Sequence, residues 1–270
     1  MADPDRSPSL AGRTILAVFA HPDDESLACG GTLARAADAG ARIVLLCATR
    51  GERGSISDAA LVPDGDLGRV RTSELREAAA ILGIADVSVF DHPDGDLRWA
   101  DVPELHDEIV AAIGRWRPDA IVTFDGDGLY WHLDHVGVHE RTLSAVQSFG
   151  VEAPPLYLVT MPKGVMRELV EAAHAKGGAS ITSSLWGIAP EVFGFEAEPP
   201  TFVIDVRHWI GRKLAALRCH RTQMGPQNPI AWIDEAEARR WLGLEQFRRA
   251  PIGGSDAAIL EQLGEPVASS

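Results

Sequence analysis

Short hydrophobic runs alternate with amphipathic stretches along most of the chain. The run at 14–19 (TILAVF) is short and rich in β-branched residues, which is typical of a buried strand. Runs of the same kind predict further strands at 42–49, 87–90, 119–125, 156–160 and 201–206. The stretches between and after them predict helices, which we expect at 27–39, 70–82, 103–116, 136–148, 161–175, 209–224 and 234–249.

This alternation predicts the fold class. Strands separated by helices of about 10–15 residues form βαβ units and a parallel sheet. We therefore expect an α/β protein with a Rossmann-like, three-layer αβα architecture and a mostly parallel sheet. With no repeat and no linker along its 270 residues, the chain is predicted to be one domain, 1–270. Its core would span about 13–225, with a C-terminal helical extension at 226–270.

Each dense polar cluster follows one of the predicted strands. The clusters lie at 21–25, 50–55, 92–96 and 125–139. Right-handed crossovers place the carboxyl ends of parallel strands at the same edge of a sheet, so these clusters can converge on one cleft. The long loop at 50–68 is also more often functional than idle in a compact domain.

The first cluster has the composition of a metal site. His21, Asp23, Asp24 and Glu25 occupy a strand-to-helix turn, where three acids and an imidazole would repel unless a positive charge lay among them. A divalent metal is the simplest such charge, and His with Asp is a zinc or iron type of ligand set. The alternative is a solvated turn whose acids cap the following helix.

Composition excludes several classes of function. The net charge of −14 argues against a general binder of nucleic acid or anionic membranes, which needs a basic face. No signal-peptide core and no apolar run long enough to span a membrane are present. The three cysteines are far apart and odd in number, which favours a reducing compartment, and we expect a cytoplasmic location.

Together the clusters resemble the LmbE/PIG-L family of zinc-dependent deacetylases, whose members remove an acetyl group from N-acetylglucosamine attached to another group. The run 20–25 (AHPDDE) matches the first motif of that family, and 132–135 (HLDH) matches its His-Pro-Asp-His motif with Leu133 in the Pro place. Weaker resemblances are Arg71-x-x-Glu74, the Pro-Asp-Gly turn at 93–95, and the late His-x-Thr-Gln at 220–223. The run 51–55 resembles the branch that acts on mycothiol precursors and conjugates.

The resemblance implies a set of roles. Zinc would be held by His21, Asp24 and His135, with water in the open fourth position, although Fe²⁺ or Co²⁺ suits the same ligands. Asp23 would be the general base. His132, protonated, would stabilise the oxyanion, and Asp134 would orient His132 and keep it charged. The proton for the leaving amine would come from Asp23 or His132.

The substrate residues are predicted more loosely. Arg71 and Asp94 match positions that touch the sugar in the family, and the place of Trp131 directly before His132 suggests stacking on a sugar face. His139 and His220 are interpreted as packing residues, and Trp99 as part of the core. We expect a small-molecule aminosugar conjugate as substrate; the oligomeric state stays open, with a homo-oligomer among the options.

Two other functions remain open from the sequence. One is an amidase that cleaves a different acyl group from an aminosugar conjugate, similar to mycothiol S-conjugate amidases. The other is a non-catalytic, Rossmann-like metal-binding protein. That second option would need a glycine-rich phosphate loop after the first strand, and the glycines at 30–31 come too late in the chain for one.

Overall fold

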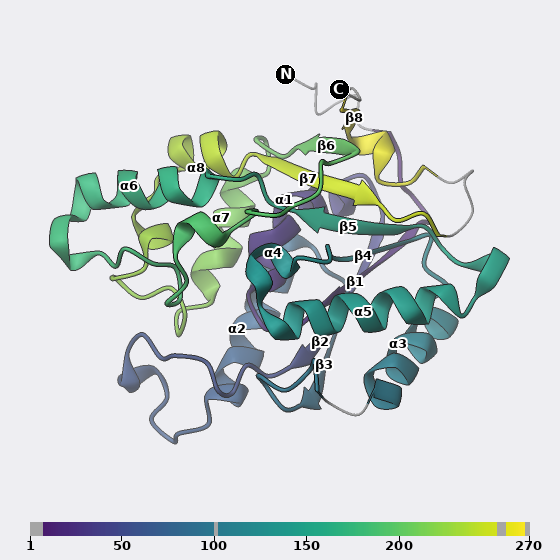
Figure 1. Cartoon of the computed structure of the whole chain (residues 1–270), viewed down its shortest axis with the longest axis horizontal. Helices are drawn as coiled ribbons and strands as arrows, with labels where there is room; N and C mark the ends of the chain where they lie inside the picture. The colour runs from purple at the N-terminus through teal and green to yellow at the C-terminus, as the bar shows by residue number, and fades with distance from the viewer. Residues whose placement is uncertain (1–7, 100–101, 253–257, 268–270) are drawn as a thin grey trace.

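The computed structural model describes residues 8–99, 102–252 and 258–267. Its strands form one sheet in the order β3-β2-β1-β4-β5-β7-β6-β8, in which β1 to β5 pair in parallel and β7, β6 and β8 pair antiparallel (Figure 1). The α/β class and the mostly parallel sheet are confirmed. The strands are β1 Thr14–Phe19, β2 Arg42–Thr49, β3 Asp86–His92, β4 Ala120–Phe124, β5 Leu156–Thr160, β6 Phe202–Asp205, β7 Leu244–Arg249 and β8 Glu265–Pro266.

Helices cover both faces of the sheet. Helices α1, α2 and α7 pack against one another behind the sheet in the view of Figure 1, and α3 and α5 pack together in front of it. The helices are α1 Asp24–Asp38, α2 Leu67–Leu82, α3 Val102–Trp116, α4 Gly128–Trp131, α5 Leu133–Gln147, α6 Val165–Gly177, α7 Ile210–Cys219 and α8 Glu235–Trp241.

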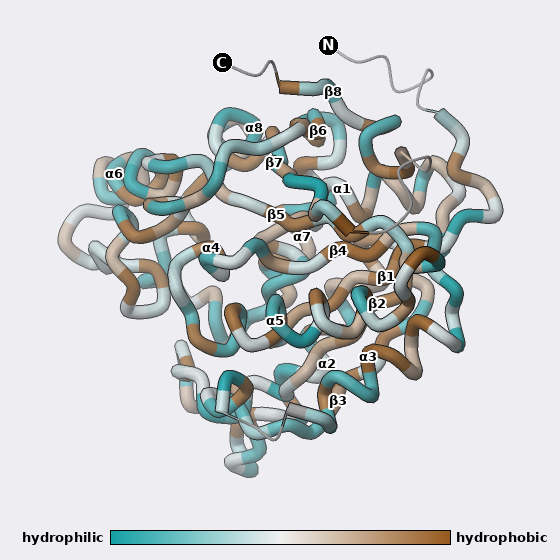
Figure 2. The backbone as a smooth tube through the Cα atoms, turned by 45° about the vertical axis from the view of Figure 1, so that its right-hand side comes forward, coloured by the Kyte–Doolittle hydropathy of each residue, from teal (hydrophilic) through white to brown (hydrophobic). Residues whose placement is uncertain are grey.

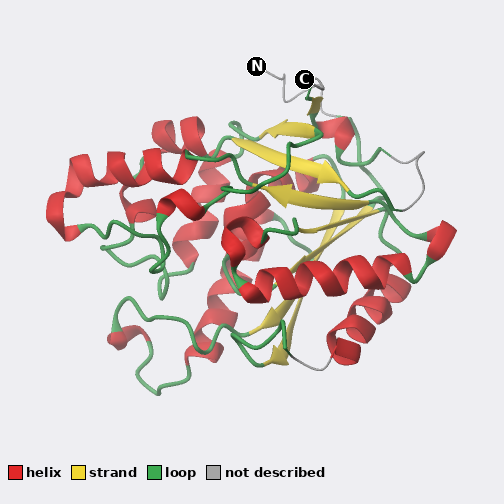
Figure 3. Cartoon of the chain, viewed as in Figure 1, coloured by secondary structure: helices red, strands yellow, loops and turns green. Residues whose placement is uncertain are grey.

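Strand β1 lies at the point where the winding of the sheet reverses. Its residue Ile15 pairs with Ile43 of β2 on one side and with Ala120 of β4 on the other. The chain builds β2 and β3 on the first side and then crosses back to build β4 and β5. Ligands of such sheets bind in the crevice beyond the carboxyl ends of the strands at this reversal. Long loops gather at that edge, on the left of Figure 3, toward which β5 points.

The core follows from the hydrophobic runs. Residues 15–19 of β1 are fully buried, and Phe19 meets Phe124 of β4 edge-to-face at 4.9 Å between ring centroids. Figure 2 shows hydrophobic segments along the central strands β4 and β5. Such runs, apolar on both faces, are what a strand covered by helices on both sides requires.

The predicted helix at 234–249 is wrong beyond Trp241. Helix α8 covers only Glu235–Trp241, with a capping box at Asp234, and residues 244–249 form β7 between β5 and β6. The inward positions of β7 are Glu245 and Phe247. Because one inward position holds an acid, the alternation of hydrophobic and polar residues that is typical of a strand does not show in the sequence. With β7 in place, the C-terminal segment is not the wholly helical extension that was expected.

Helix α1 is two segments joined at Cys29, where φ is −147°. Glu245 of β7 accepts hydrogen bonds from the backbone N–H groups of Gly31 (3.0 Å) and Thr32 (2.7 Å), and so caps the second segment. The buried ammonium of Lys213 on α7 lies 2.6 Å from the same carboxylate. The second segment of α1 is thereby tied to β7 and α7.

Smaller differences concern single elements. The helix predicted at 209–224 ends at Cys219, and the short helix α4 was not predicted. Trp99 is 73% exposed, so its assignment to the core is wrong. Within the part of the chain that the structure describes, no helix has both the length and the hydrophobicity to cross a lipid bilayer.

Candidate active site

The first motif forms a tight turn between β1 and α1. Strand β1 ends at Phe19, and the Asp24 carboxylate accepts a hydrogen bond from the backbone N–H of His21 at 2.7 Å. Asp23 sits at the cap of α1 with φ of 124°, a value that non-glycine residues rarely adopt. Such strain at the head of a motif is typical of a functional site.

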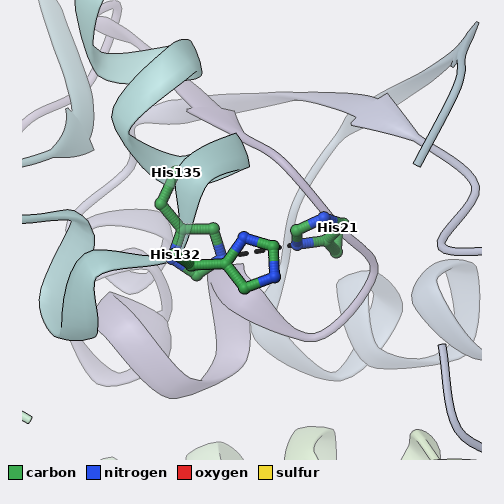
Figure 4. Close-up of side chains that lie close together, drawn as sticks. All are labelled: His21, His132 and His135. Atoms are coloured by element: carbon green, nitrogen blue, oxygen red, sulfur yellow. Dashed lines mark hydrogen bonds between the residues drawn. The ribbon is translucent and has the colours of Figure 1, made fainter. Parts of the chain in front are cut away.

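The second motif forms the start of α5, beyond the end of β4. His132 is the N-cap, and its Nδ1 accepts a hydrogen bond from the backbone N–H of Asp134 at 3.2 Å. His135 is fully buried and stacks on Phe124 with 4.0 Å between ring centroids. The two motifs, more than 100 residues apart in sequence, meet where β1 and β4 end side by side, and Figure 4 shows the three imidazole rings close together.

Three potential ligand atoms converge at this point. His21 Nδ1 lies 3.3 Å from His135 Nε2, as the dashed line in Figure 4 marks, and 3.5 Å from Asp24 Oδ2. His135 Nε2 lies 3.1 Å from Asp24 Oδ1. The structure thus brings together the three residues predicted to bind a metal.

The opposite nitrogens of both rings are already occupied. His21 Nε2 donates to Asp134 at 3.0 Å, and His135 Nδ1 donates to the Gly128 carbonyl at 3.0 Å. A hydrogen bond joins the two converging nitrogens, so one of them carries a proton in this structure. The bonds on the opposite side orient both rings as in metal-binding histidines, and a metal that displaced this proton would meet both lone pairs. Ligand bonds of about 2.0–2.1 Å in a tetrahedral site place two ligand atoms about 3.3 Å apart, so the observed spacing fits a metal ion.

The electrostatics of the cluster favour a cation. Burial alone would lower the pKa of His21, but its hydrogen bonds to Asp134, Asp24 and Asp94 outweigh burial and raise the pKa well above the ordinary value. Burial would raise the pKa of Asp24, but His135 and His21 hold it well below the usual range. The carboxylates around His21 therefore stay charged and attract positive charge.

Asp23 is not one of the predicted metal ligands, and its carboxylate is available for proton transfer. It lines the cavity beside the ligand cluster, and its Oδ2 lies 3.2 Å from Arg71 Nη2. Burial raises the pKa of Asp23 to about 6, against the opposing charge of Arg71. This is the residue predicted to be the general base, and its position leaves it open to that role.

Asp134 has a different partner from the one predicted. Its carboxylate accepts from His21 Nε2 and from the backbone N–H groups of Gly95 (2.7 Å) and Leu97 (2.9 Å), and no hydrogen bond joins it to the His132 ring in the described structure. Only its backbone N–H contacts that ring. Asp134 therefore orients the first histidine of the site, and the expectation that its carboxylate orients His132 is wrong.

The surroundings of His132 do not favour the charge predicted for it. Burial, followed by the charges of His135 and His21, lowers the pKa of His132 to about 4. The ring is therefore neutral near pH 7. Because Nδ1 accepts a hydrogen bond, the proton of the neutral ring resides on Nε2, which can still donate a hydrogen bond.

Arg71 is buried, with 3% of its surface exposed, and joins the loops of the site. It donates to the carbonyls of Pro22 (2.7 Å) and Gly51 (2.9 Å) besides contacting Asp23. A Cβ on Gly51 or Gly54 would lie 2.4–2.5 Å from Arg71 Nη1, so the glycines in this loop permit its close approach.

Asp94 comes to the same cavity from the turn after β3. Its Oδ1 lies 3.2 Å from His21 Nε2, and its Oδ2 accepts from the backbone N–H of Arg53 at 2.8 Å. Burial opposes ionisation of Asp94, but the contact with His21 lowers its pKa to about 2. The structure thus places Arg71 and Asp94 at the cavity, as predicted for substrate residues.

The cavity has a volume of about 240 Å³. Trp131 is 47% exposed and is not among the residues that line the cavity, so the structure does not bring it to the site. The sequence analysis assigned no role to Tyr130 or Trp186, which both line the cavity. The lining residues are His21, Asp23, Asp24, Leu27, Gly54, Ser55, Arg71, Asp94, Tyr130, His132, Trp186, Ile188 and Gln223.

The late motif at 220–223 supports the site through hydrogen bonds to two buried acids. His220 is fully buried and lies 3.1 Å from Glu25 Oε1, and Glu25 Oε2 accepts from the backbone N–H of Asp23 at 3.1 Å. Glu74 accepts from the backbone N–H and hydroxyl of Thr222 at 3.0 and 2.6 Å. His220 is thus a packing residue, as expected, but one whose contact leads to Asp23.

Comparison with known proteins adds independent evidence. The model of the family described as "PIG-L: GlcNAc-PI de-N-acetylase" matches residues 16–146. The chain is 31% identical to the 1D-myo-inositol 2-acetamido-2-deoxy-alpha-D-glucopyranoside deacetylase of Acidothermus cellulolyticus, over 87% of this chain and 88% of that protein. It is 34% identical to the deacetylase of the same name from Thermobispora bispora, over 88% of each chain.

A solved structure has the same fold. The conserved protein TT1542 from Thermus thermophilus superposes with a TM-score of 0.59 at 27% identity, covering 88% of this chain and 94% of that one. Residues 16–146, which match the family model, include both histidine motifs, whose side chains form the cluster described above. The chain therefore belongs to the PIG-L (LmbE) family of de-N-acetylases and is an amide hydrolase.

Proposed function

We propose that this enzyme is a zinc-dependent N-deacetylase of an N-acetylglucosaminyl conjugate. The observation that carries the proposal is the convergence of His21 Nδ1, His135 Nε2 and an Asp24 carboxylate, all within 3.5 Å of one another, next to the Asp23 carboxylate, which lines the same cavity. A metal centre with a further acid beside it is the arrangement that amide hydrolysis by activated water requires.

His21, Asp24 and His135 would hold the zinc. When bound, zinc supplies a water of lowered pKa and a Lewis acid for the carbonyl oxygen of the acetamide. The mixed nitrogen and oxygen donor set, with three protein ligands, leaves a position open for that water, as catalytic zinc sites do. Asp134 and the Gly128 carbonyl orient both imidazoles as in metal-binding histidines.

The protein's own groups then move the protons. Asp23 accepts a proton from the attacking water and passes it to the nitrogen of the departing amine, since its carboxylate lines the cavity and Arg71 holds it in place. Neutral His132 donates a hydrogen bond from Nε2–H to the carbonyl oxygen as negative charge develops there. Tyr130 lines the same cavity, and burial raises its pKa well above the usual value, so its hydroxyl stays protonated as a second donor.

The relatives suggest the substrate. Their printed names specify a 2-acetamido-2-deoxyglucoside of myo-inositol. We therefore propose N-acetylglucosaminyl-inositol as the first compound to test, with the sugar ring held near Arg71 and Asp94. The cytoplasmic location, the single-domain organisation and the absence of nucleic-acid or membrane partners stay predictions from the sequence.

The test is amine release from N-acetylglucosaminyl-inositol by protein of known metal content. We expect about one zinc per chain and release that chelators abolish. Asp23→Asn should retain zinc while losing at least about a hundredfold in kcat, the usual contribution of a general base. Asp24→Ala should lose the metal itself. Full activity in metal-free protein, or in Asp23→Asn, would contradict the proposal.

A further inference from the structure

A second cavity opens beside the catalytic one. The two share Ser55, Trp186 and Gln223, and the second, which we name the side trough, has a volume of about 380 Å³. The trough is lined by segments of three loops, and its lining residues are Ser55, Ile56, Ser57, Thr182, Ser184, Trp186, Gly187, Thr222, Gln223, Gly225, Pro226, Gln227 and Asn228.

The lining of the side trough carries no charged side chain. This contrasts with the chain as a whole, of which 24% is charged, and with the catalytic cavity, which holds Asp23, Asp24, Arg71 and Asp94. Hydroxyl and amide side chains dominate instead. A neutral lining of this kind suits a ligand that offers hydroxyl groups, and gives a charged ligand no partner for its charge.

The wall of the side trough is held by its own hydrogen bonds. Gln223 Nε2 donates to the Ser55 carbonyl at 2.8 Å, which joins the loop after β2 to the late motif. The Thr182 hydroxyl donates to the Ser184 carbonyl at 2.7 Å, and the Thr182 N–H donates to the Gln227 carbonyl at 3.0 Å. The trough is therefore built by contacts among three separate loops, which hold its shape before a ligand arrives.

Trp186 stands at the junction of the two cavities in a strained conformation. It is in a two-residue turn closed by hydrogen bonds of 2.9 and 2.8 Å between Leu185 and Ile188, with φ of 52° at Trp186 and 83° at Gly187. Turns with two positive φ angles favour Asn and Gly, and a bulky aromatic residue there is unusual. An outlier of this kind at a cavity points to a function of the side chain.

The indole of Trp186 also has an unmet hydrogen bond. Its Nε1 is buried and has no partner in the described structure. Because the nitrogen itself is buried, the part of this half-buried side chain that can reach the cavities is the ring. An aromatic ring offers a broad apolar surface on which the ring of a sugar or polyol can pack.

We propose that the side trough is the aglycone subsite of the deacetylase and accepts an uncharged polyol ring. The proposal rests on the proposed function, because the N-acetylated sugar would fill the catalytic cavity. Trp186 packs its indole ring against the ring of the aglycone at the junction. Conjugates whose aglycone carries a phosphate or carboxylate are accordingly poor substrates.

The test compares two substrates that differ only in the aglycone. Methyl N-acetyl-α-glucosaminide fills the catalytic cavity alone, whereas N-acetylglucosaminyl-inositol fills both cavities. Ser184→Phe places bulk in the side trough, and the ratio of kcat/KM for the conjugate to that for the methyl glycoside should fall at least about tenfold, the loss expected when the favourable contacts of one ring are removed. Ser183→Phe, at the exposed neighbouring position outside the trough lining, is the matched control and should leave this ratio unchanged.

Two further variants test the chemistry of recognition. Trp186→Ala removes the aromatic ring at the junction, so kcat/KM for the conjugate should fall about 3–10-fold, the effect of one ring contact. Gln227→Arg adds a positive charge to the trough and should improve kcat/KM for a conjugate with phosphorylated inositol relative to the neutral one. Equal ratios in wild type, Ser184→Phe and Ser183→Phe would overturn the subsite.

A measurement of conjugate binding tests the aglycone subsite separately from the proposed deacetylation reaction. Calorimetry on zinc-loaded Asp23→Asn measures conjugate affinity without turnover, and Ser184→Phe in that background should weaken it by at least about tenfold. Conjugate binding that Ser184→Phe leaves unchanged overturns the subsite, even where the wild-type enzyme deacetylates the conjugate. Absence of amine release by the wild type, together with conjugate binding that Ser184→Phe weakens, overturns the proposed reaction and leaves the subsite standing.

Discussion

Replacing Lys213 with methionine should destabilise the protein more than any surface substitution. Lys213 is 1% exposed and Glu245 is 4% exposed, and the ammonium lies 2.6 Å from the carboxylate. Methionine keeps the length and most of the volume of the side chain, so packing is largely retained. What is lost is the charge that neutralises the buried Glu245.

The expected magnitude follows from what remains around Glu245. Without Lys213, the partners left to the carboxylate among the described residues are the backbone N–H groups of Gly31 and Thr32. Removing one member of a buried ion pair costs about 3–5 kcal/mol. In a protein of this size, that corresponds to a fall in Tm of roughly 6–20 °C.

The assay is urea unfolding of the zinc-loaded protein, with Lys176→Met as the matched control. Lys176 forms an exposed ion pair with Glu237, and its replacement should leave the free energy of unfolding nearly unchanged. The double variant Lys213→Met/Glu245→Gln should recover much of the loss, because it leaves no uncompensated charge. A loss below about 1 kcal/mol for Lys213→Met, or no recovery in the double variant, would refute the reasoning.

Three further predictions concern the site. Gly54→Ala should lower kcat/KM about 10–100-fold with little change in Tm, because the new Cβ would lie 2.5 Å from Arg71 Nη1 and displace it; unchanged steady-state kinetics would contradict this. Dialysis against a chelator should remove the metal and lower Tm in a scanning calorimeter, and zinc should restore both, since a ligand bound only to the folded state stabilises it. His220→Ala should lower the free energy of unfolding in urea by about 1–3 kcal/mol, because Glu25 loses a buried partner. It should also lower kcat while the metal content measured by mass spectrometry stays the same. An unchanged kcat would show that the contact through Glu25 does not reach Asp23.

The parallel half of the sheet could be predicted from the sequence because its signals are local. Strand β1 is a continuous hydrophobic run, and the residues that follow it carry their ligand chemistry within five positions. The rule that parallel strands end at one edge then brought His21 and His135 together without any coordinates. The metal-ligand set could be reached in the same way, because it needs only the two motifs and their places after β1 and β4.

The remaining features depend on contacts that spacing along the chain does not reveal. Asp134 is two residues from His132, yet its carboxylate points to His21 and to the turn after β3. Glu245 made β7 look unlike a strand because its partner, Lys213, lies on another element. Trp186 lies in an irregular segment, where only a turn with two positive φ angles makes its position significant.

The position of β7 affects how the protein is made. Strand β5 ends at Thr160, but the neighbour that covers its outer edge, β7, is not synthesised until residues 244–249. Proteins are synthesised from the N-terminus, so β5 has an open edge while the next 80 or so residues are added. An open strand edge can pair with other chains. A nascent chain of this enzyme should therefore be most prone to aggregation just before β7 emerges. Mutations that slow the docking of β7 should reduce the yield of soluble enzyme more than the stability of the finished fold.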